Sequence, residues 1–448
     1  MFKKILIANR GEIALRVIYA CRELNISTVA VYSEADEEAL HVRFADEAVC
    51  IGPPRPIDSY LNVPAIISAA EITDSDAIHP GYGFLSESAY MCEAVEACGI
   101  KFIGPPSSVI RLMGDKVSAR EAMKSAGLPV LPGTTDSPET LIQAKKAAKK
   151  LGYPLMIKAT AGGGGRGMRV VRSTEDLEQV WQMAQREAEA AFGDSKLLLE
   201  KYVEAPRHIE IQVIADSQGH VVHLGERECS IQRRHQKLIE ECPSVLLTER
   251  QRRKLGRMVV DAAKAVGYCN AGTFEFLMDD KGDFYFLEVN ARLQVEHPVT
   301  EMVTGIDIVK EQIQIAAGNP LSVKQNEITW TGHALECRIN AENPDTFRPS
   351  PGVISVFSVP GARGPGLRID TAVHAGCTVS PYYDSLVAKI IAHGINRDEA
   401  VARMRRALRM IVIEGIETSV PLHQRILDDS DFLAGKLSTA FMDRFVSS

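Results

Sequence analysis

Five polar side chains alternate with apolar ones in the stretch LEVNARLQVE of residues 287–296. An extended chain sends alternate side chains to opposite faces, so the polar set would share one surface. That set is Glu288, Asn290, Arg292, Gln294 and Glu296. Carboxylates, amides and a guanidinium on one surface could bind a cation and an anion side by side. A half-buried antiparallel strand whose polar face meets water would give the same alternation, so the neighbouring sequence must decide between the two interpretations.

The segment upstream predicts a β-hairpin that brings two carboxylates together. Two aromatic-rich runs flank the turn-forming sequence Asp-Lys-Gly-Asp at residues 280–283. A symmetric turn sets Glu275 directly opposite Glu288, with β-carbons roughly 4.5–5.5 Å apart. Like charges at that distance are destabilising unless a cation lies between them. With the amide oxygen of Asn290 the pair forms an all-oxygen set suited to Mg²⁺, and we favour this metal site over a hydrated face.

A second group of residues predicts a phosphate site. The strand candidate YPLMIKA of residues 153–159 carries Lys158 and leads into a loop with four consecutive glycines at 162–165. Without Cβ atoms, such a loop can bring successive backbone N–H groups close to phosphate oxygens. The loop matches neither a Walker loop nor the dinucleotide pattern, and alone it could equally be a flexible surface loop. Between Lys158 and the carboxylate hairpin, it indicates a site for a nucleoside triphosphate.

Eight separated motifs occur in one order along the chain. They are residues 7–14 (IANRGEIA), 79–87 (HPGYGFLSE), 113–116 (MGDK), 163–168 (GGGRGM), 233–237 (RRHQK), 288–298 (EVNARLQVEHP), 336–342 (ECRINAE) and 381–385 (PYYDS). On these motifs the chain resembles the ATP-grasp superfamily and, within it, the biotin carboxylases. The likeness runs from residue 7 to residue 385 and so covers most of the sequence.

The expected fold class is α/β and α+β. A strand pattern, helical spacing of apolar residues and a second strand pattern within residues 4–32 predict a doubly wound, Rossmann-like start. The resemblance implies three domains. They are an N-terminal domain at residues 1–114, an ATP-grasp fold at 115–330 with a mobile lid at 131–203, and a mainly β domain with helices at 331–446.

The resemblance also implies a role for each matching residue. The residues expected to bind ATP are Lys116, Lys158, Gly164, Gly165, Glu200, Lys201, Tyr202, Val203, His208, His235, Glu275 and Glu288. Two Mg²⁺ or Mn²⁺ ions are expected on Glu275, Glu288 and Asn290, and bicarbonate on Lys237, Arg292, Gln294 and the Val295 amide. The implied catalytic set is Arg292, Glu296, Arg338 and Lys237. In that set Glu296 would be the base toward bicarbonate, and Arg338 would steady the biotin ureido oxygen as negative charge develops.

The implied activity is ATP-dependent carboxylation of biotin through carboxyphosphate. Bicarbonate would attack the γ-phosphate of MgATP, and the carboxyl group would then pass to biotin on a biotin carboxyl carrier protein. Lys124 stands in Met-Lys-Ser rather than in the family's Met-Lys-Met attachment context, so we expect it to be a surface lysine. Biotin would therefore be a carrier-bound substrate. A separate carboxyltransferase and a homodimer are also implied.

Other functions share part of this pattern. The chain is expected to serve acetyl-CoA carboxylase in fatty acid synthesis, but Ala291 replaces a threonine frequent in that type, so a pyruvate, 2-oxo acid or propionyl-CoA carboxylase stays open. Another ATP-grasp ligase, of the purine or carbamoyl phosphate type, would keep Lys116, Lys158 and the glutamate pair. It should lack Arg292-x-Gln294-x-Glu296 with Arg338. A non-catalytic module should have a broken metal pair or glycine loop, and neither is broken.

Composition limits the remaining possibilities. The net charge of −7 argues against nucleic acid, and the basic residues 250–254 (RQRRK) are typical of a solvated helix face. Nine cysteines without a C-x-x-C pair fit free thiols in a reducing compartment. No apolar run approaches the ~18 residues of a membrane span, so a cytoplasmic protein is expected.

Overall fold

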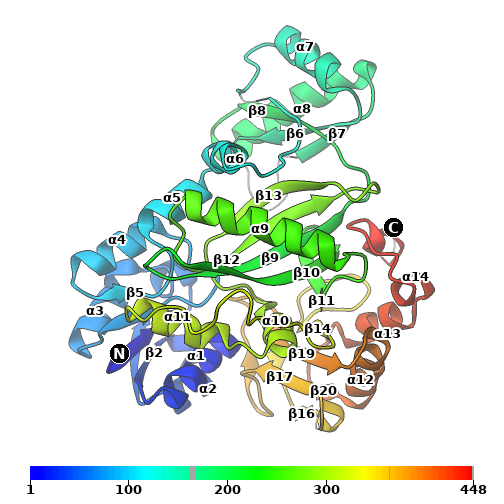
Figure 1. Cartoon of the computed structure of the whole chain (residues 1–448). Helices are drawn as coiled ribbons and strands as arrows, with labels where there is room; N and C mark the ends of the chain where they lie inside the picture. The colour runs from blue at the N-terminus through cyan, green and yellow to red at the C-terminus, as the bar shows by residue number, and fades with distance from the viewer. Residues whose placement is uncertain (135, 161–167, 363, 446–448) are drawn as a thin grey trace.

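The molecule has a broad base and a narrower part raised above it (Figure 1). The computed structural model describes residues 1–134, 136–160, 168–362 and 364–445. The N-terminal and C-terminal regions lie on opposite sides of the base, with the central region between them. The mixed α/β architecture expected from the sequence is confirmed.

The N-terminal region is a parallel sheet with helices on both faces. Its strands are β1 (Lys4–Ile7), β2 (Ser27–Ser33), β3 (Glu47–Gly52), β4 (Ala77–His79) and β5 (Lys101–Phe102), in the order β3-β2-β1-β4-β5. Its helices are α1 (Gly11–Glu23), α2 (Leu40–Phe44), α3 (Val63–Ile72), α4 (Ala89–Ala97) and α5 (Ser107–Gly114). Leu6 packs with α3 and α4, whereas Ile5 and Ile7 pack with α1 on the other face. The predicted doubly wound start is therefore confirmed.

The raised part is a three-stranded antiparallel sheet with two helices. It contains α7 (Leu141–Leu151), β6 (Leu155–Ala159), β7 (Met168–Val171), α8 (Thr174–Phe192) and β8 (Leu197–Lys201), and the sheet order is β7-β6-β8. Its own small core includes Trp181, Leu155 and Leu197. The helix α6 (Lys116–Ser125) leads into it. All of these elements except α6 fall within residues 131–203, which were predicted to form a lid.

An eight-stranded sheet forms the centre of the base. Its order is β13-β12-β9-β10-β11-β14-β19-β17. The strands are β9 (Arg207–Ala215), β10 (Val221–Arg233), β11 (Gln236–Cys242), β12 (Asn270–Met278), β13 (Phe284–Asn290), β14 (His333–Asn340), β17 (Leu367–Thr371) and β19 (Leu386–Gly394). Because β11 pairs with β14, one sheet continues across residue 330, which was not predicted from the sequence.

Helices and short strands complete the base. They are α9 (Glu249–Ala265), α10 (His297–Thr304), α11 (Ile308–Ala316), α12 (Arg397–Met410), α13 (Val420–Asp428) and α14 (Ser430–Leu433), with β15 (Gly352–Val353), β16 (Val356–Ser358), β18 (Thr378–Val379) and β20 (Val412–Glu414). Short 3₁₀ turns lie at Glu34–Asp36, Pro56–Asp58, Pro360–Ala362 and Phe441–Arg444.

The alternating stretch 287–296 is only partly a strand. The strand β13 ends at Asn290, and α10 begins at His297. The extended conformation assumed for the whole stretch is therefore wrong beyond Asn290. One reason is that Pro298 suits the first turn of a helix, which sets the start of α10 next to the stretch.

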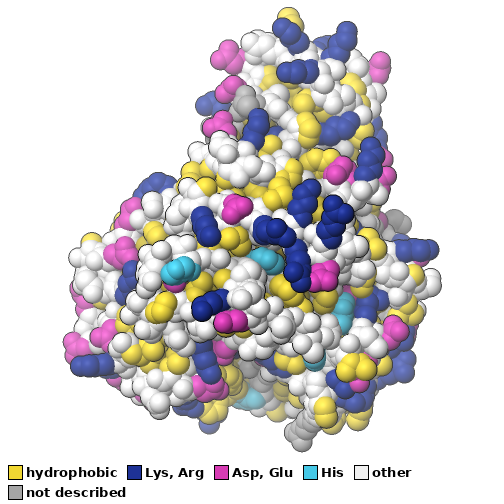
Figure 2. Space-filling model, viewed as in Figure 1, with side chains coloured by type: hydrophobic (Ala, Val, Ile, Leu, Met, Phe, Trp, Pro, Cys, Tyr) yellow, Lys and Arg dark blue, Asp and Glu magenta, His cyan; other side chains and the backbone are white. Residues whose placement is uncertain are grey.

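The surface agrees with the composition. Figure 2 shows Lys and Arg side chains gathered along α9, whose buried face includes Leu255 and Val259. The solvated basic helix face predicted from the sequence is confirmed for Arg250, Arg253 and Lys254, which are exposed. It is wrong for Arg252, which pairs with the buried Glu226 at 2.6 Å. All nine cysteines are free. Among the helices of the described residues, none combines the length and the apolar character that crossing a membrane requires.

Four buried histidines predict acid sensitivity of the fold. Burial lowers the pKa of His41, His223 and His423 to about 4 and that of His79 to about 3, from an ordinary value of 6.5. Between these values the unfolded chain binds more protons than the folded one, so stability falls as the pH drops from about 6.5 toward 4. We expect the thermal midpoint to fall over this window. In His41→Gln the number of protons taken up on unfolding should drop by about one, and an unchanged uptake would contradict the prediction.

Candidate active site

A cleft of about 2110 Å³ lies between the raised part and the base. Most of the residues predicted from the sequence to act together line it. They are Lys116, Lys158, Glu200, Lys201, Tyr202, Val203, His208, His235, Lys237, Glu275, Glu288, Asn290, Arg292, Gln294, Val295 and Arg338. Glu296 is fully buried and contacts two of these residues. Gly164 and Gly165, with the rest of the glycine loop, lie outside the described residues.

Three glutamates form a row across neighbouring strands. Glu210 of β9 pairs in register with Glu275 of β12, and Glu275 pairs with Glu288 of β13. The predicted pairing of Glu275 with Glu288 is thus confirmed, but the symmetric turn is not. Nearer the turn Phe276 pairs with Phe286, and a β-bulge next to Glu275 shifts the register by one residue. Burial opposes ionisation of both hairpin carboxyls, but Lys237 lowers the pKa of Glu275, whereas Glu275 raises the pKa of Glu288, which faces the cleft. A divalent cation between Glu275 and Glu288 would relieve this repulsion, so the pair fits a metal such as Mg²⁺.

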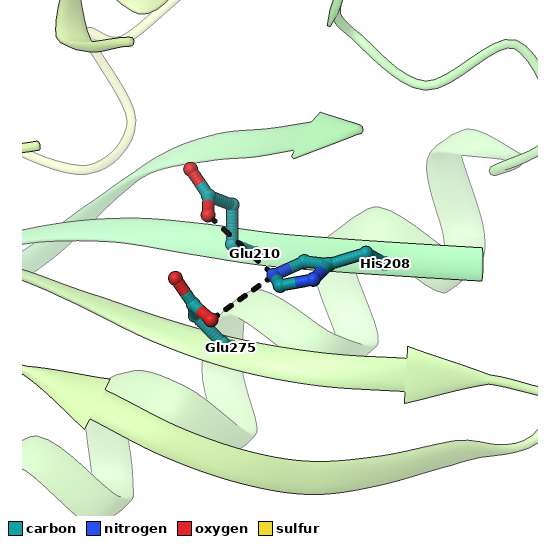
Figure 3. A group of neighbouring side chains, drawn as sticks. All are labelled: His208, Glu210 and Glu275. Carbon is teal, nitrogen blue, oxygen red and sulfur yellow. Dashed lines mark ion pairs between the residues drawn. The ribbon is translucent and has the colours of Figure 1, made fainter. Parts of the chain in front are cut away.

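His208 and Lys237 lie on the same glutamates. Figure 3 shows the His208 ring directed toward Glu210 and Glu275, with its Nε2 atom 3.8 and 3.1 Å from their oxygens. The Lys237 Nζ atom donates to Glu210 at 2.6 Å, to Glu275 at 2.9 Å and to Glu296 at 2.6 Å. Burial opposes its charge, but these carboxylates raise the pKa of Lys237 well above its ordinary value. The ammonium group of Lys237 therefore offsets part of the negative charge of these three glutamates.

Arg292 organises the predicted anion site. Its Nε donates to Glu87 at 2.8 Å, its Nη1 to Gln294 at 3.1 Å and its Nη2 to the Asn290 Oδ1 atom at 2.9 Å. The Asn290 and Gln294 amide nitrogens in turn donate to Glu275. Because the Asn290 oxygen faces Arg292, the oxygens presented to a cation here come from Glu275 and Glu288. Arg292 keeps a planar, charged group at the cleft wall that can pair with an anion.

Glu296 lies between two cations beneath the cleft. Its carboxylate accepts hydrogen bonds from Lys237 Nζ at 2.6 Å and from Arg338 Nη2 at 2.8 Å, and its side chain is fully buried. Burial opposes ionisation, but Lys237, Arg338 and Arg227 hold the pKa of Glu296 well below its ordinary range. The carboxylate is therefore ionised and able to accept a proton once the local charge changes.

The raised part supplies the opposite wall of the cleft. Lys158 of β6 lies 2.5 Å from Glu200 of β8, and Arg120 of α6 lies 2.6 Å from the same carboxylate. Lys116 is the first residue of α6. His235 has a φ of 68° in the turn between β10 and β11 and faces the cleft. Two lysines from different elements thus line one side of the cleft, where they can contact phosphate groups.

Three glutamates that hold the site together were not predicted from the sequence. Glu87 binds Arg292, Glu210 binds Lys237, and Glu240 binds Arg338 at 2.6 Å. A signal was present for Glu210, because residues 208–213 (HIEIQV) alternate polar and apolar side chains as residues 287–296 do. Glu87 lies in a recognised motif, but nothing in its spacing shows that it binds Arg292.

Comparison with known proteins shows the relationship. Family models match residues 1–110 (Biotin carboxylase, N-terminal domain), 115–324 (Carbamoyl-phosphate synthase L chain, ATP binding domain) and 336–444 (Biotin carboxylase C-terminal domain). The chain is 57% identical to a biotin carboxylase of Allochromatium vinosum over 100% of this chain and 99% of that protein. It is 52% identical to the 2-oxoglutarate carboxylase small subunit of Hydrogenobacter thermophilus over 99% of this chain and 93% of that protein.

A solved structure gives the same result. The crystal structure of the biotin carboxylase domain dimer of the Hydrogenobacter thermophilus 2-oxoglutarate carboxylase, in complex with MgADP, ADP and bicarbonate, is 52% identical. It superposes with a TM-score of 0.94 over 99% of this chain and 98% of that one.

Proposed function

The chain belongs to the biotin carboxylase family, and we propose that it carries out the ATP-dependent carboxylation of carrier-bound biotin with bicarbonate. One observation carries the proposal. The facing glutamates Glu275 and Glu288 lie in the same cleft as Arg292 and Arg338. A metal-nucleotide site and an anion site in one cleft are what the transfer of phosphate to bicarbonate requires.

We assign the nucleotide to the wall formed by the raised part and the glutamate row. The residues proposed for ATP are Lys116, Lys158, Gly164, Gly165, Glu200, Lys201, Tyr202, Val203, His208, His235, Glu275 and Glu288. Glu275 and Glu288 would hold Mg²⁺, with Asn290 joining only if its oxygen leaves Arg292. The metal would neutralise developing charge on the phosphates.

We assign bicarbonate to the wall formed by Arg292. Lys237, Arg292, Gln294 and the Val295 amide are the proposed contacts. A bicarbonate oxygen attacks the γ-phosphorus, the bond to the ADP oxygen breaks, and Glu296 accepts the bicarbonate proton. The carboxyphosphate then releases CO₂, the biotin ureido nitrogen attacks that CO₂, and the phosphate takes the nitrogen's proton. Arg338 stabilises the ureido oxygen during this second step.

The wider assignment is also a proposal. We propose acetyl-CoA carboxylase as the complex served, with pyruvate, 2-oxo acid and propionyl-CoA carboxylases as alternatives. We further propose a cytoplasmic homodimer that works with a biotin carboxyl carrier protein and a carboxyltransferase, and domains at residues 1–114, 115–330 and 331–446 with a mobile lid at 131–203. Purification with the bound partners, followed by assay of each acceptor, tests the complex. Carboxylation of pyruvate but not acetyl-CoA would overturn the preferred assignment.

Arg338→Gln should separate the two half-reactions. If Arg338 serves biotin alone, biotin carboxylation should fall by ~10²–10³-fold, as when one oxyanion donor is removed, while a slow bicarbonate-dependent ATPase remains. Both rates are measured on one preparation. Arg397→Gln is the matched control, because Arg397 binds Glu241, the neighbour of Glu240 in β11, at 2.7 Å but lies outside the cleft lining. Equal loss of both rates in Arg338→Gln would show that Arg338 supports the phosphate site or the fold.

A further inference from the structure

Two fully buried glutamates face each other behind Arg338. Glu240 of β11 and Glu336 of β14 are register partners in the antiparallel sheet. The Glu240 Oε1 atom accepts from Arg338 Nε at 2.6 Å, and Arg338 Nη2 lies 2.5 Å from the same oxygen. Within the described part of the chain, no donor reaches Glu240 Oε2 or either oxygen of Glu336. Neither residue was assigned a role from the sequence.

Among the described residues, only one of these two carboxyls has a cation as a direct hydrogen-bond partner. Arg338 binds Glu240. The nearby Lys389 lies 3.0 Å from Glu12 and donates to the Val295 carbonyl at 2.9 Å. An unpaired carboxylate in a dry interior is costly, and a second carboxylate opposite increases that cost. Glu336 therefore carries a proton, and Glu240 is the anion that balances Arg338.

Arg338 is held between two carboxylates. Its Nε atom donates to Glu240, and its Nη2 atom donates to Glu296 at 2.8 Å. Among the described residues, these hydrogen bonds use Nε and Nη2 of Arg338 but not Nη1. The Arg338 side chain lines the cleft. With its Nε edge fixed, the planar guanidinium has little rotational freedom, so the direction of Nη1 is determined by Glu240.

We propose that Glu240 is a positioning residue for biotin carboxylation: as an anion beside a neutral Glu336, it orients Arg338 toward the substrate in the cleft. This inference rests on the proposed function for the role of Arg338. Glu240 touches no substrate itself. Its effect is to keep Arg338 from turning fully toward Glu296, which the proposed mechanism needs as a base.

The pair also predicts a pH dependence. Burial, together with the charge of Glu296, raises the pKa of Glu240 to about 7 even though Arg338 opposes the shift. Burial raises the pKa of Glu336 well above its ordinary value. The titratable and charged groups around the pair are Arg338 of β14, Glu296 before α10, Lys237 of β11, Cys229 of β10, Cys337 of β14 and Lys389 of β19. As the pH falls through about 7, Glu240 gains a proton and Arg338 loses an anionic partner.

The test compares variants of the full chain in two assays. Biotin carboxylation and biotin-independent, bicarbonate-dependent ATPase are measured from pH 6 to pH 9, with kcat and KM for biotin obtained separately. The substitutions are Glu240→Gln, Glu240→Asp, Glu336→Gln and Glu241→Gln. Glu241 is the matched control, because it is a buried glutamate of the same strand that binds Arg397 on the opposite face of the sheet.

The expected pattern is specific to Glu240. In the wild type, the ratio of carboxylation to ATPase should decline as the pH falls through about 7. In Glu240→Gln this ratio should be lower by up to ~10²-fold, mainly through kcat, and should no longer decline in that pH range. Glu240→Asp should restore part of the ratio and the decline. Glu336→Gln mimics a neutral acid and should keep the wild-type ratio. Glu241→Gln should lower the thermal midpoint while keeping the wild-type ratio and pH profile.

Other outcomes overturn the inference. A wild-type ratio and pH profile in Glu240→Gln would remove the positioning role. A loss in Glu336→Gln as large as that in Glu240→Gln would show that Glu336 is charged. A wild-type protein that carboxylates no biotin would instead refute the proposed function itself, so the two failures are distinguishable.

Discussion

Glu288→Lys should abolish magnesium-dependent ATP turnover. The substitution places an ammonium group opposite Glu275, at the position where the proposed metal must bind both carboxylates. Burial and the repulsion by Glu275 raise the pKa of Glu288. In the variant an ion pair with Glu275 would replace that repulsion, and the affinity for a divalent cation would be lost. Because the Glu288 side chain faces the cleft, the fold should survive. Steady-state ATPase and MgATP binding by calorimetry measure the effect.

Asp280→Lys is the matched control for this experiment. Asp280 lies in the turn of the same hairpin, is exposed, and does not line the cleft. The same change of charge there should leave ATP turnover near the wild-type rate. Normal magnesium-dependent turnover in Glu288→Lys would disprove the assignment of the glutamate pair to the metal.

Glu296→Gln should lower the carboxylation rate by ~10²–10⁴-fold, the usual contribution of a general base. Lys237 and Arg338 keep Glu296 ionised but also make it a weak base in the ligand-free cleft. A bicarbonate anion bound beside Glu296 would raise the pKa of Glu296, because like charges disfavour each other. The base would thus become effective when its substrate arrives.

Binding and pH measurements separate this role from a structural one. ATP affinity should be unchanged in Glu296→Gln, since Glu296 accepts hydrogen bonds from Lys237, Arg338 and the Cys229 thiol and from none of the residues proposed for ATP. Glu311→Gln serves as the control, because Glu311 is a buried glutamate of α11 that binds Ser322 and lies outside the cleft lining. If the pH–rate profile of Glu296→Gln matches that of the wild type, another residue is the base.

The hairpin and the pairing of Glu275 with Glu288 were predictable from the sequence because that information is local. Aromatic runs and a turn sequence predict the pair, but a β-bulge next to Glu275, rather than a symmetric turn, brings the two residues opposite each other. The parallel N-terminal sheet was also predictable, since strand and helix periods alternate clearly there. The extended strand predicted from the alternation at residues 287–296 is wrong beyond Asn290, where the chain leaves the sheet and continues to α10.

The contacts between distant segments could not be predicted from spacing. Glu87 meets Arg292 across 205 positions, and Glu240 meets Arg338 across 98. Such pairs depend on how the sheets pack, and one central sheet joins β11 to β14 across the expected domain boundary. Periodicity shows which face a side chain occupies, but the partner on that face is fixed by tertiary structure.

Carboxylation of free biotin by the purified wild-type chain is the decisive measurement for the proposed function. With MgATP, labelled bicarbonate and biotin, we expect slow formation of labelled carboxybiotin together with an equal amount of ADP. Omitting bicarbonate should stop both products, because the anion attacks the γ-phosphate in the first step. ATP cleavage that is indifferent to bicarbonate and biotin, with no label in biotin, would contradict the proposed function.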